Sequence, residues 1–483
     1  MNTCIIMLLT LGAYFLLLLA VSQKSVQRAD NDAFFRAGRR SRWWMVAFGM
    51  IGASISGVSF VSVPAWVAST GMTYLQMCAG FVAGYLAVAF VLLPVYYRLR
   101  LTSIYSYLSE RFGHRSHQTG TLFFLLSKLT GAAARLYLVC IVLEAFVFRP
   151  LGIPFTLGVL GLLLLVWLYT RRGGIQTLVR TDALQTLCML LALGGVIWAA
   201  AETLGLDLQG IWQTIRESPM SQVFDWDWAS RQNFWKQFLS GMFVVIVMTG
   251  LDQDMMQKNL TCSSLREAQK DMCAYGACFL PVNALFLGLG VLLYAVCAQR
   301  GIPVPAQADS LLPSLVASGV LGTAVVLPFT IGIVSAAFSS ADSAITALTT
   351  TACIDLLDIE RPEVPRHRAE RIRRWVHVAV IAAFVGCIWL FRLAGSASII
   401  NTIYVMASYT YGPLLGLYFF GLFSRRRVRD GLVPAGCVLA PMLCAALDYG
   451  APLWWDYTFG YELLMLNGAL TAGWLWLISR PEP

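Results

Sequence analysis

The residues of this sequence most able to do chemistry are hydroxyls and a carboxylate inside a long apolar segment, residues 321–357. Ser335, Ser339, Asp342, Ser343 and Thr346 share one face of a helix with 3.6 residues per turn. Their hard oxygen atoms suit an alkali cation better than a soft metal ion. A hydrogen-bonded packing seam would explain serine and threonine alone, but a carboxylate at this depth favours a functional site.

A second candidate is the segment 49–64, which opens the first long apolar block after a basic loop. It holds four serines, three glycines and Pro64, and such residues disfavour a straight helix. An unwound stretch in a bilayer is tolerated only where its carbonyl groups line a cavity or hold an ion. The alternative is a face of small residues that lets two helices approach closely.

Two more polar stretches accompany these. Asp182 lies in the first turn of a helix that follows a glycine pair, where it serves either as an ion ligand or as a cap that charges the helix N-terminus. Residues 249–259 close the apolar block that begins near Phe234. A broken helix there would correspond to segment 49–64 in the other half of an inverted-repeat transporter; the alternative is a helix that runs out into the cytoplasm.

Two basic residues within the apolar segment 119–148 form a further candidate. Lys128 and Arg135 lie seven residues apart and so share a helix face. Lys128 either extends toward the membrane surface or pairs with a carboxylate. The planar guanidinium of Arg135 either holds a substrate carboxylate through two hydrogen bonds or forms an internal ion pair.

The elements that must position these residues are membrane-spanning helices. Hydrophobic residues make up 58% of the chain and charged residues 13%, and the apolar residues form about thirteen blocks long enough to cross a bilayer. We therefore expect an all-α polytopic protein of the cell (inner) membrane. Most lysines and arginines fall in alternate loops, which predicts an outside N-terminus and a cytoplasmic C-terminus, and assigns the net charge of +9 to topology rather than to nucleic acid.

Several classes of function are disfavoured. The twelve cysteines are scattered without a C-x-x-C pair, and the four histidines lie in or beside basic loops. The chain has no Walker-type glycine loop for ATP and no arrangement of histidine, cysteine or serine typical of a catalytic triad. We expect no enzyme activity and no organic cofactor, with sodium as the one metal ion.

In these segments the chain resembles the sodium/solute symporter family, which includes bacterial proline, galactose and sialic acid symporters. The resemblance extends from about Asn31 to Phe423. Its carriers, in matching order and spacing, are residues 53–57, Gly173–Gly174 with Thr181, Asp182 and Gln185, Gly250 with Gln253, Gln257 and Lys258, and residues 339–343.

The resemblance implies three parts. Residues 1–30 would hold a leading helix, and residues 31–424 a core of five plus five helices in inverted repeats, at about 43–202 and 233–424. Residues 425–483 would then hold two trailing helices.

The resemblance also implies binding sites. A first sodium site would involve the backbone carbonyls of Gly52, Ile55 and Ala336 and the hydroxyls of Ser339 and Ser340. A second, present in some relatives, corresponds to Asp182, Ser339, Asp342 and Ser343. Because Asp342 stands where some of those relatives carry a hydroxyl, the number of sodium ions stays open. Substrate positions would be Ser54, Ser56, Ser59, Gln76, Arg135, Asp252 and Gln253.

These features predict a symporter that imports a small polar solute by alternating access driven by sodium. An arginine equivalent to Arg135 binds the carboxylate in sialic acid symporters, so a carboxylated solute is one candidate, but the residues around Gln76 depart from both the sialic acid and the sugar patterns. The alternatives are a permease coupled to protons through Asp182 or Asp342, and a solute sensor or channel without coupled transport. The expected partners are the solute, sodium and membrane lipid; the oligomeric state is left open.

Overall fold

The chain folds into an array of helices with one minimal strand pair. A computed structural model describes residues 3–25, 31–55, 57–171, 174–394, 399–455 and 457–481. Its longer helices are α1 (Thr3–Ser25), α3 (Trp43–Ser54), α4 (Gly57–Thr70), α5 (Tyr74–Ala87), α8 (His114–Leu143), α9 (Phe155–Thr170), α10 (Ile175–Leu204), α12 (Phe234–Val245), α14 (Leu265–Arg300), α16 (Val326–Thr351), α17 (Arg366–Ala394), α18 (Ile399–Thr410), α19 (Gly412–Phe423), α20 (Val433–Trp455) and α21 (Leu463–Leu477).

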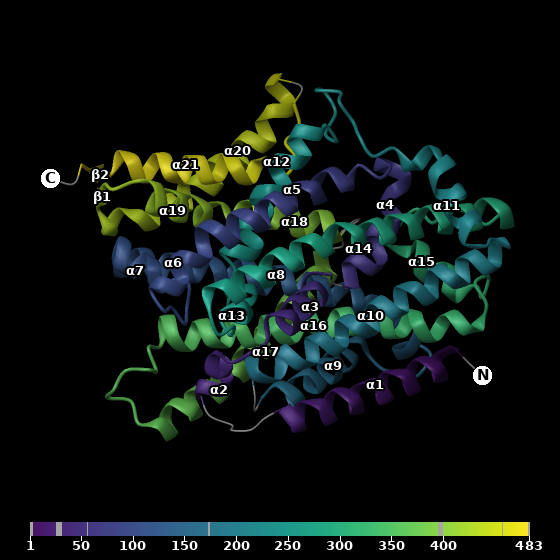
Figure 1. Cartoon of the computed structure of the whole chain (residues 1–483), viewed down its shortest axis with the longest axis horizontal. Helices are drawn as coiled ribbons and strands as arrows, with labels where there is room; N and C mark the ends of the chain where they lie inside the picture. The colour runs from purple at the N-terminus through teal and green to yellow at the C-terminus, as the bar shows by residue number, and fades with distance from the viewer. Residues whose placement is uncertain are drawn as a thin grey trace.

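Shorter elements connect these helices. They are α2 (Asn31–Arg36), α6 (Leu93–Arg98), α7 (Ser106–Arg111), α11 (Leu208–Glu217), α13 (Gln253–Asn259) and α15 (Leu311–Ala317). Strand β1 (Arg427–Val428) pairs antiparallel with β2 (Ser479–Arg480). The start of α1 and strand β2 lie toward opposite ends of the long axis (Figure 1).

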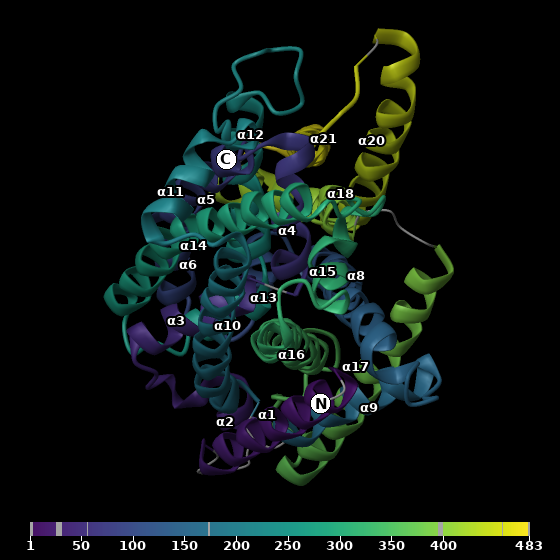
Figure 2. The same cartoon turned by 90° about the vertical axis from the view of Figure 1, so that its right-hand side faces the viewer.

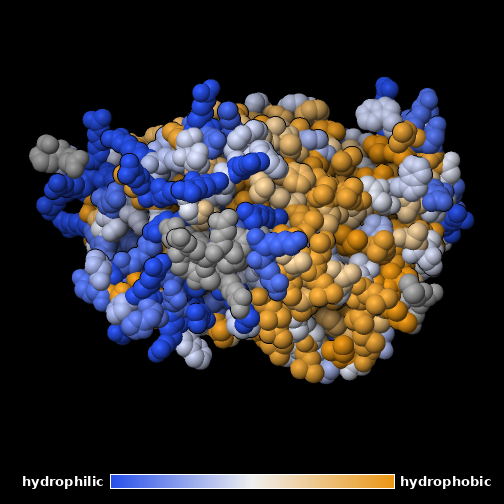
Figure 3. Space-filling model, turned by 60° about the horizontal axis from the view of Figure 1, so that its bottom comes forward, coloured by the Kyte–Doolittle hydropathy of each residue, from blue (hydrophilic) through white to orange (hydrophobic). Residues whose placement is uncertain are grey.

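The lengths and apolar character of the helices confirm an all-α membrane fold. Within the described residues, eight helices are long and apolar enough to cross a bilayer, or ten if each of two bent pairs is one span, and four more apolar helices are shorter. The expected number of thirteen is therefore not confirmed. Hydrophobic side chains cover a broad band of the surface, and hydrophilic ones gather toward its ends (Figure 3), as contact with lipid requires.

Helix α16 lies at the centre of the array. Figure 2 views it nearly end-on, with α10, α17 and α1 around it. It packs against α10, α8, α1, α17, α4 and α3, so the side chains of residues 329–351 are almost all buried. Because α16 contacts protein on every side rather than lipid, it can carry the serines, threonines and Asp342 that a lipid-facing helix would not tolerate.

Two spans are broken at comparable places. The chain bends by 59° between Trp43–Ser54 and Ser59–Thr70, and by 68° between Phe234–Gly250 and Gln253–Asn259. At the first break Ile55 leaves the helix in an extended conformation. At the second, Asp252 is extended and its carboxylate accepts the backbone N–H of Asp254, so it ends one helix and caps the next. This confirms that residues 249–259 form a broken helix rather than a straight continuation.

Glycines bring α5 and α12 into close contact. A Cβ atom at Gly80 would lie 2.0 Å from the carbonyl oxygen of Phe238, and one at Gly241 would lie 2.2 Å from that of Met77. The obstructing atoms belong to the backbone, so a side chain at either position must push the helices apart.

We expect Gly80→Ala to destabilise the protein by about 1–3 kcal/mol, the usual penalty for overpacking. Thermal denaturation in detergent measures the effect. Gly194→Ala is the matched control, because no atom lies within 4 Å of a Cβ at that helical position. Equal melting temperatures for the two variants would contradict the close contact.

Candidate functional site

A cavity of about 100 Å³ opens where the first broken span meets α8, α12, α14 and α18. Four of the predicted substrate residues line it: Ser54, Ser59, Arg135 and Asp252. Phe81, Tyr85, Tyr275, Phe279, Tyr404 and Tyr411 form aromatic walls, and Met248 and Met255 add apolar surface. A few polar groups among apolar and aromatic walls is the usual composition of a small-molecule site.

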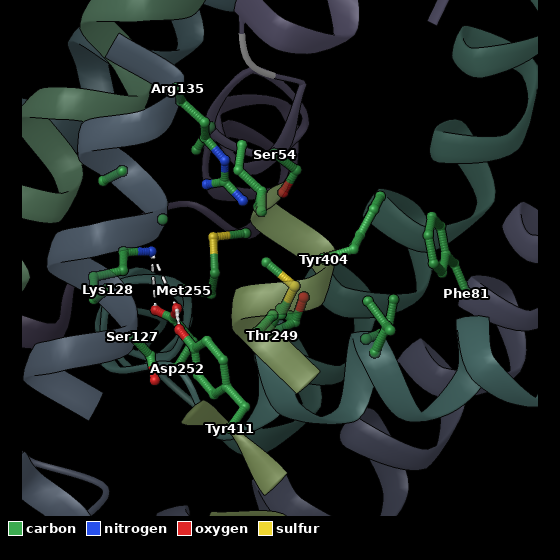
Figure 4. Close-up of a pocket in the computed structure, with 18 of the residues that line it drawn as sticks. Ser54, Phe81, Ser127, Lys128, Arg135, Thr249, Asp252, Met255, Tyr404 and Tyr411 are labelled. Atoms are coloured by element: carbon green, nitrogen blue, oxygen red, sulfur yellow. Dashed lines mark hydrogen bonds and ion pairs between the residues drawn. The ribbon is translucent and has the colours of Figure 1, made fainter. Parts of the chain in front are cut away.

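Arg135 presents its charge to the cavity. Its guanidinium extends from α8 into the open space beside Ser54 (Figure 4). Among the described residues it makes no hydrogen bond or ion pair. Of the two interpretations of Arg135, the internal ion pair is not observed in the described part of the chain, and the guanidinium faces the cavity.

The ion pair belongs instead to Lys128, which precedes Arg135 by about two turns of the same helix. The Lys128 Nζ lies 3.1 Å from both carboxylate oxygens of Asp252 and 2.7 Å from Asp254 Oδ2. The Tyr411 hydroxyl donates to Asp252 Oδ2 at 2.7 Å. All four side chains are buried, so the pairing is confirmed and the charges of Lys128 and Asp252 largely neutralise each other at the edge of the cavity (Figure 4).

Ser54 already has a partner on the far wall. Its hydroxyl forms a short hydrogen bond with the hydroxyl of Tyr275, which also accepts from Tyr85 at 2.8 Å. This links the end of α3 to α5 and α14. The position of Ser54 at the break is therefore fixed by hydroxyl contacts rather than by helix geometry alone.

Two of the predicted substrate residues, Gln76 and Gln253, are not brought to this cavity. Gln76 donates to the Gln232 carbonyl at 2.8 Å and accepts from the Asp225 N–H at 3.1 Å. Gln253 accepts from the Ile104 N–H at 2.9 Å and donates to the Thr102 carbonyl at 2.8 Å. Both amides thus hold loop backbones, which an amide does well because it has a donor and an acceptor. Ser56 lies outside the described residues.

The residues predicted for the first sodium site lie on elements that meet. Helix α3 contacts α16 and α10, and the Gly52 N–H donates to Thr186 Oγ1 on α10 at 3.0 Å. Ile55, Ala336, Ser339 and Ser340 are all buried. Among the described residues the Ser340 hydroxyl has no hydrogen-bond partner. A buried hydroxyl without a partner, on a helix that contacts the broken span, is compatible with a ligand for a bound cation, so the residues fit sodium.

The residues predicted for the second sodium site also come together, but with a lysine among them. Ser339 Oγ donates to Asp182 Oδ1 at 3.2 Å and Ser343 Oγ to Asp182 Oδ2 at 3.4 Å. Lys258 Nζ lies 2.7 Å from Asp182 Oδ2. Asp342 Oδ2 accepts from the Tyr169 hydroxyl at 2.6 Å.

Sequence reasoning missed several of these contacts. It recorded Lys258 as part of a motif but did not place it against Asp182, and it did not single out Tyr169 or Tyr411. The available signal was a lysine four residues after Asp254 in a helix too polar to face lipid. Nothing in the spacing of Tyr169 indicates its contact with Asp342.

Comparison with known proteins agrees with this architecture. The profile of the sodium:solute symporter family matches residues 34–438. The chain is 24% identical to the sodium/sialic acid symporter of Proteus mirabilis over 96% of this chain and 92% of that protein. It is 25% identical to the human sodium/iodide cotransporter over 89% of this chain and 66% of that protein.

Solved structures show the same fold. The substrate-bound outward-open state of a Na⁺-coupled sialic acid symporter superposes with a TM-score of 0.84 and 20% identity, covering 98% of this chain and 99% of the other. Mhp1, a nucleobase-cation-symport-1 family transporter in a closed conformation, superposes with a TM-score of 0.57 and 14% identity. The match covers 92% of this chain and 93% of the other.

The family match spans most of the chain, and the fold, the two broken spans and the polar central helix are those of a transporter rather than an enzyme. The chain belongs to the sodium:solute symporter family and is a sodium-coupled symporter of a small organic solute.

Proposed function

We propose that the chain imports a small polar organic solute that carries a carboxylate, with Arg135 as the group that binds it. One observation carries this proposal: the guanidinium of Arg135 faces the cavity without a partner among the described residues, while the nearby Lys128 is already paired with Asp252 and Asp254. Arg135 is partly buried in a cavity with aromatic walls, where a carboxylate ligand could form two parallel hydrogen bonds with its guanidinium.

The walls of the cavity support a solute with a ring or other apolar surface in addition to the carboxylate. Tyr85, Tyr275, Phe279 and Tyr404 offer aromatic faces and edges, and Ser59, Ser127 and Thr249 offer hydroxyl groups for hydrogen bonds. Carboxylated solutes also appear in the names of similar proteins, namely the sialic acid symporter of Proteus mirabilis and a sodium-coupled monocarboxylate transporter of Danio rerio. The chemistry of the cavity fits this class.

For the coupling ion, we propose the site of Gly52, Ile55, Ala336, Ser339 and Ser340. Support comes from the orphan hydroxyl of Ser340 and from the break after Ser54, which frees backbone carbonyl groups next to α16. Sodium bound there would join α3 to α16 and hold one side of the cavity in place. Each sodium entering down 100 mV contributes about 2.3 kcal/mol before its concentration term, enough to concentrate a solute many-fold.

The proposed alternating access rests on two inverted repeats at residues 43–202 and 233–424. The two bent spans support this division, because each lies at the start of its half. The proposed orientation, with the N-terminus outside and the C-terminus cytoplasmic, rests on the basic loops.

We expect Ser340→Ala to raise about tenfold or more the sodium concentration that gives half-maximal thermal stabilisation. Loss of a contact to a charged group costs about 1.5–3 kcal/mol, which corresponds to this change in affinity. The measurement is thermal denaturation of the purified protein, with choline replacing sodium at constant ionic strength. Thr330→Val is the control, because it removes a buried hydroxyl from the same helix that only bonds the Val326 carbonyl. An unchanged sodium response of Ser340→Ala would contradict the site.

We expect sialic acid or pyruvate, but not galactose, to stabilise the protein in the presence of sodium, because only the first two carry a carboxylate. Arg135→Gln should abolish this shift, and Arg135→Lys should retain part of it, since lysine keeps the charge but not the planar pair of donors. Arg149→Gln, at an exposed position, serves as the control. A carboxylate response that survives Arg135→Gln would refute the role of Arg135.

Uptake by proteoliposomes completes the test of function. A solute that stabilises the protein in the thermal test should accumulate in proteoliposomes only when a sodium gradient is present. If a pH gradient drives uptake equally well with choline in place of sodium, the chain is a proton-coupled permease instead.

A further inference from the structure

A lysine stands among the residues expected to hold a second sodium ion. Lys258 Nζ lies 2.7 Å from Asp182 Oδ2 and 2.6 Å from Ser343 Oγ, and the Lys258 side chain is 2% exposed. Asp182 and Ser343 are two of the four residues that the family resemblance assigns to that ion. Their oxygen atoms already contact a cation that is covalently part of the chain.

The position of Lys258 is fixed by the second broken span. Helix α13 begins at Gln253, directly after the cap residue Asp252, and packs against α16, α3 and α10. One turn before Lys258 on the same helix, Asp254 Oδ1 lies 3.6 Å from Lys258 Nζ. Lys258 thus contacts Asp182 and Ser343 on two other helices and lies near Asp254 on its own helix.

An ammonium group and a sodium ion compete for the same oxygen atoms. Lysine donates up to three hydrogen bonds and accepts none, so each oxygen it contacts at 2.6–2.7 Å has a lone pair directed at it. A sodium ion sharing Asp182 Oδ2 and Ser343 Oγ would lie within a few ångströms of the ammonium group. At that separation and in a buried setting, two positive charges repel strongly.

Lys258 already compensates the carboxylate at this place. Its ammonium group contacts the Asp182 carboxylate and lies near Asp254, which also contacts Lys128. Asp342 Oδ2 accepts from the neutral hydroxyl of Tyr169. At Asp182, Lys258 therefore supplies the positive charge that a second sodium ion would otherwise supply.

We propose that Lys258 takes the place of the second sodium ion, so that this symporter binds one sodium ion per chain. The inference deepens the proposed function and rests on the first sodium site described above. It makes Lys258 the residue that determines the stoichiometry of sodium coupling, with Asp182 and Ser343 as its partners rather than as ligands of a transported ion.

The test is to count sodium ions by equilibrium binding of ²²Na⁺ to the purified full-length protein at saturation. We expect one ion per chain for the parent protein and for Lys258→Arg, which keeps the positive charge. Lys258→Met removes the positive charge near Asp182 and Asp342, so this variant should bind two sodium ions per chain. The double variant Lys258→Met/Asp182→Asn should return to one.

Two ions bound by the parent protein, or one ion bound by a monodisperse Lys258→Met protein, would overturn the role of Lys258 alone. No bound sodium in the parent would overturn the first site as well. If Lys258→Met does not fold, the Ser343→Ala variant tests the proposal instead. With Lys258 in place, this variant should bind sodium with the affinity of the parent, and a clear loss of affinity would identify Ser343 as a sodium ligand.

Discussion

The constraint on which this structure depends is that charges buried among membrane helices must be paired. Lys128 contacts Asp252 and Asp254, Asp254 approaches Lys258, and Lys258 contacts Asp182, so charges of alternating sign run through the interior without a break. Removing one member of such a pair leaves an uncompensated buried charge, which typically costs about 3–5 kcal/mol. Tyr411 and Tyr169 complete the arrangement with neutral donors to Asp252 and Asp342. The network is therefore a condition of folding as well as a feature of the binding region.

This network connects parts of the chain that are far apart in sequence. Its members come from α8, α10, α13 and α16, so these helices are held together by charge as well as by packing. The short helix α13 has a central role because two of its residues contact different helices: Asp254 contacts Lys128 on α8, and Lys258 contacts Asp182 on α10. Because the break at Asp252 turns α13 away from the axis of α12, α13 reaches both Lys128 and Asp182.

The same network joins the cavity to the residues of the proposed sodium site. Asp252 and Lys128 line the cavity, whereas Asp182 accepts a hydrogen bond from Ser339, a residue of the proposed sodium site. A change of charge or position at one end therefore alters the electrostatic energy at the other through direct contacts. Coupling of ion and solute requires such a dependence between sites, and reciprocity follows from thermodynamic linkage. Arg135 stands apart from these pairs within the described residues, which makes it the cavity cation with capacity for a ligand.

The sequence alone determined the class of fold, the broken character of segment 49–64, the polar face of α16 and the residues that carry the family resemblance, because apolar block length, helix periodicity and glycine or proline content are local properties. It left open whether Lys128 or Arg135 forms the internal ion pair, and it placed Gln76 and Gln253 with the substrate, whereas their amides hold loop backbones. Only the tertiary structure decided these points, and only it brought Lys258 to Asp182, 76 positions away in the numbering of the chain. The physical reason is that the partner of a buried charge is set by how non-neighbouring helices pack, and no local pattern of residues encodes that geometry.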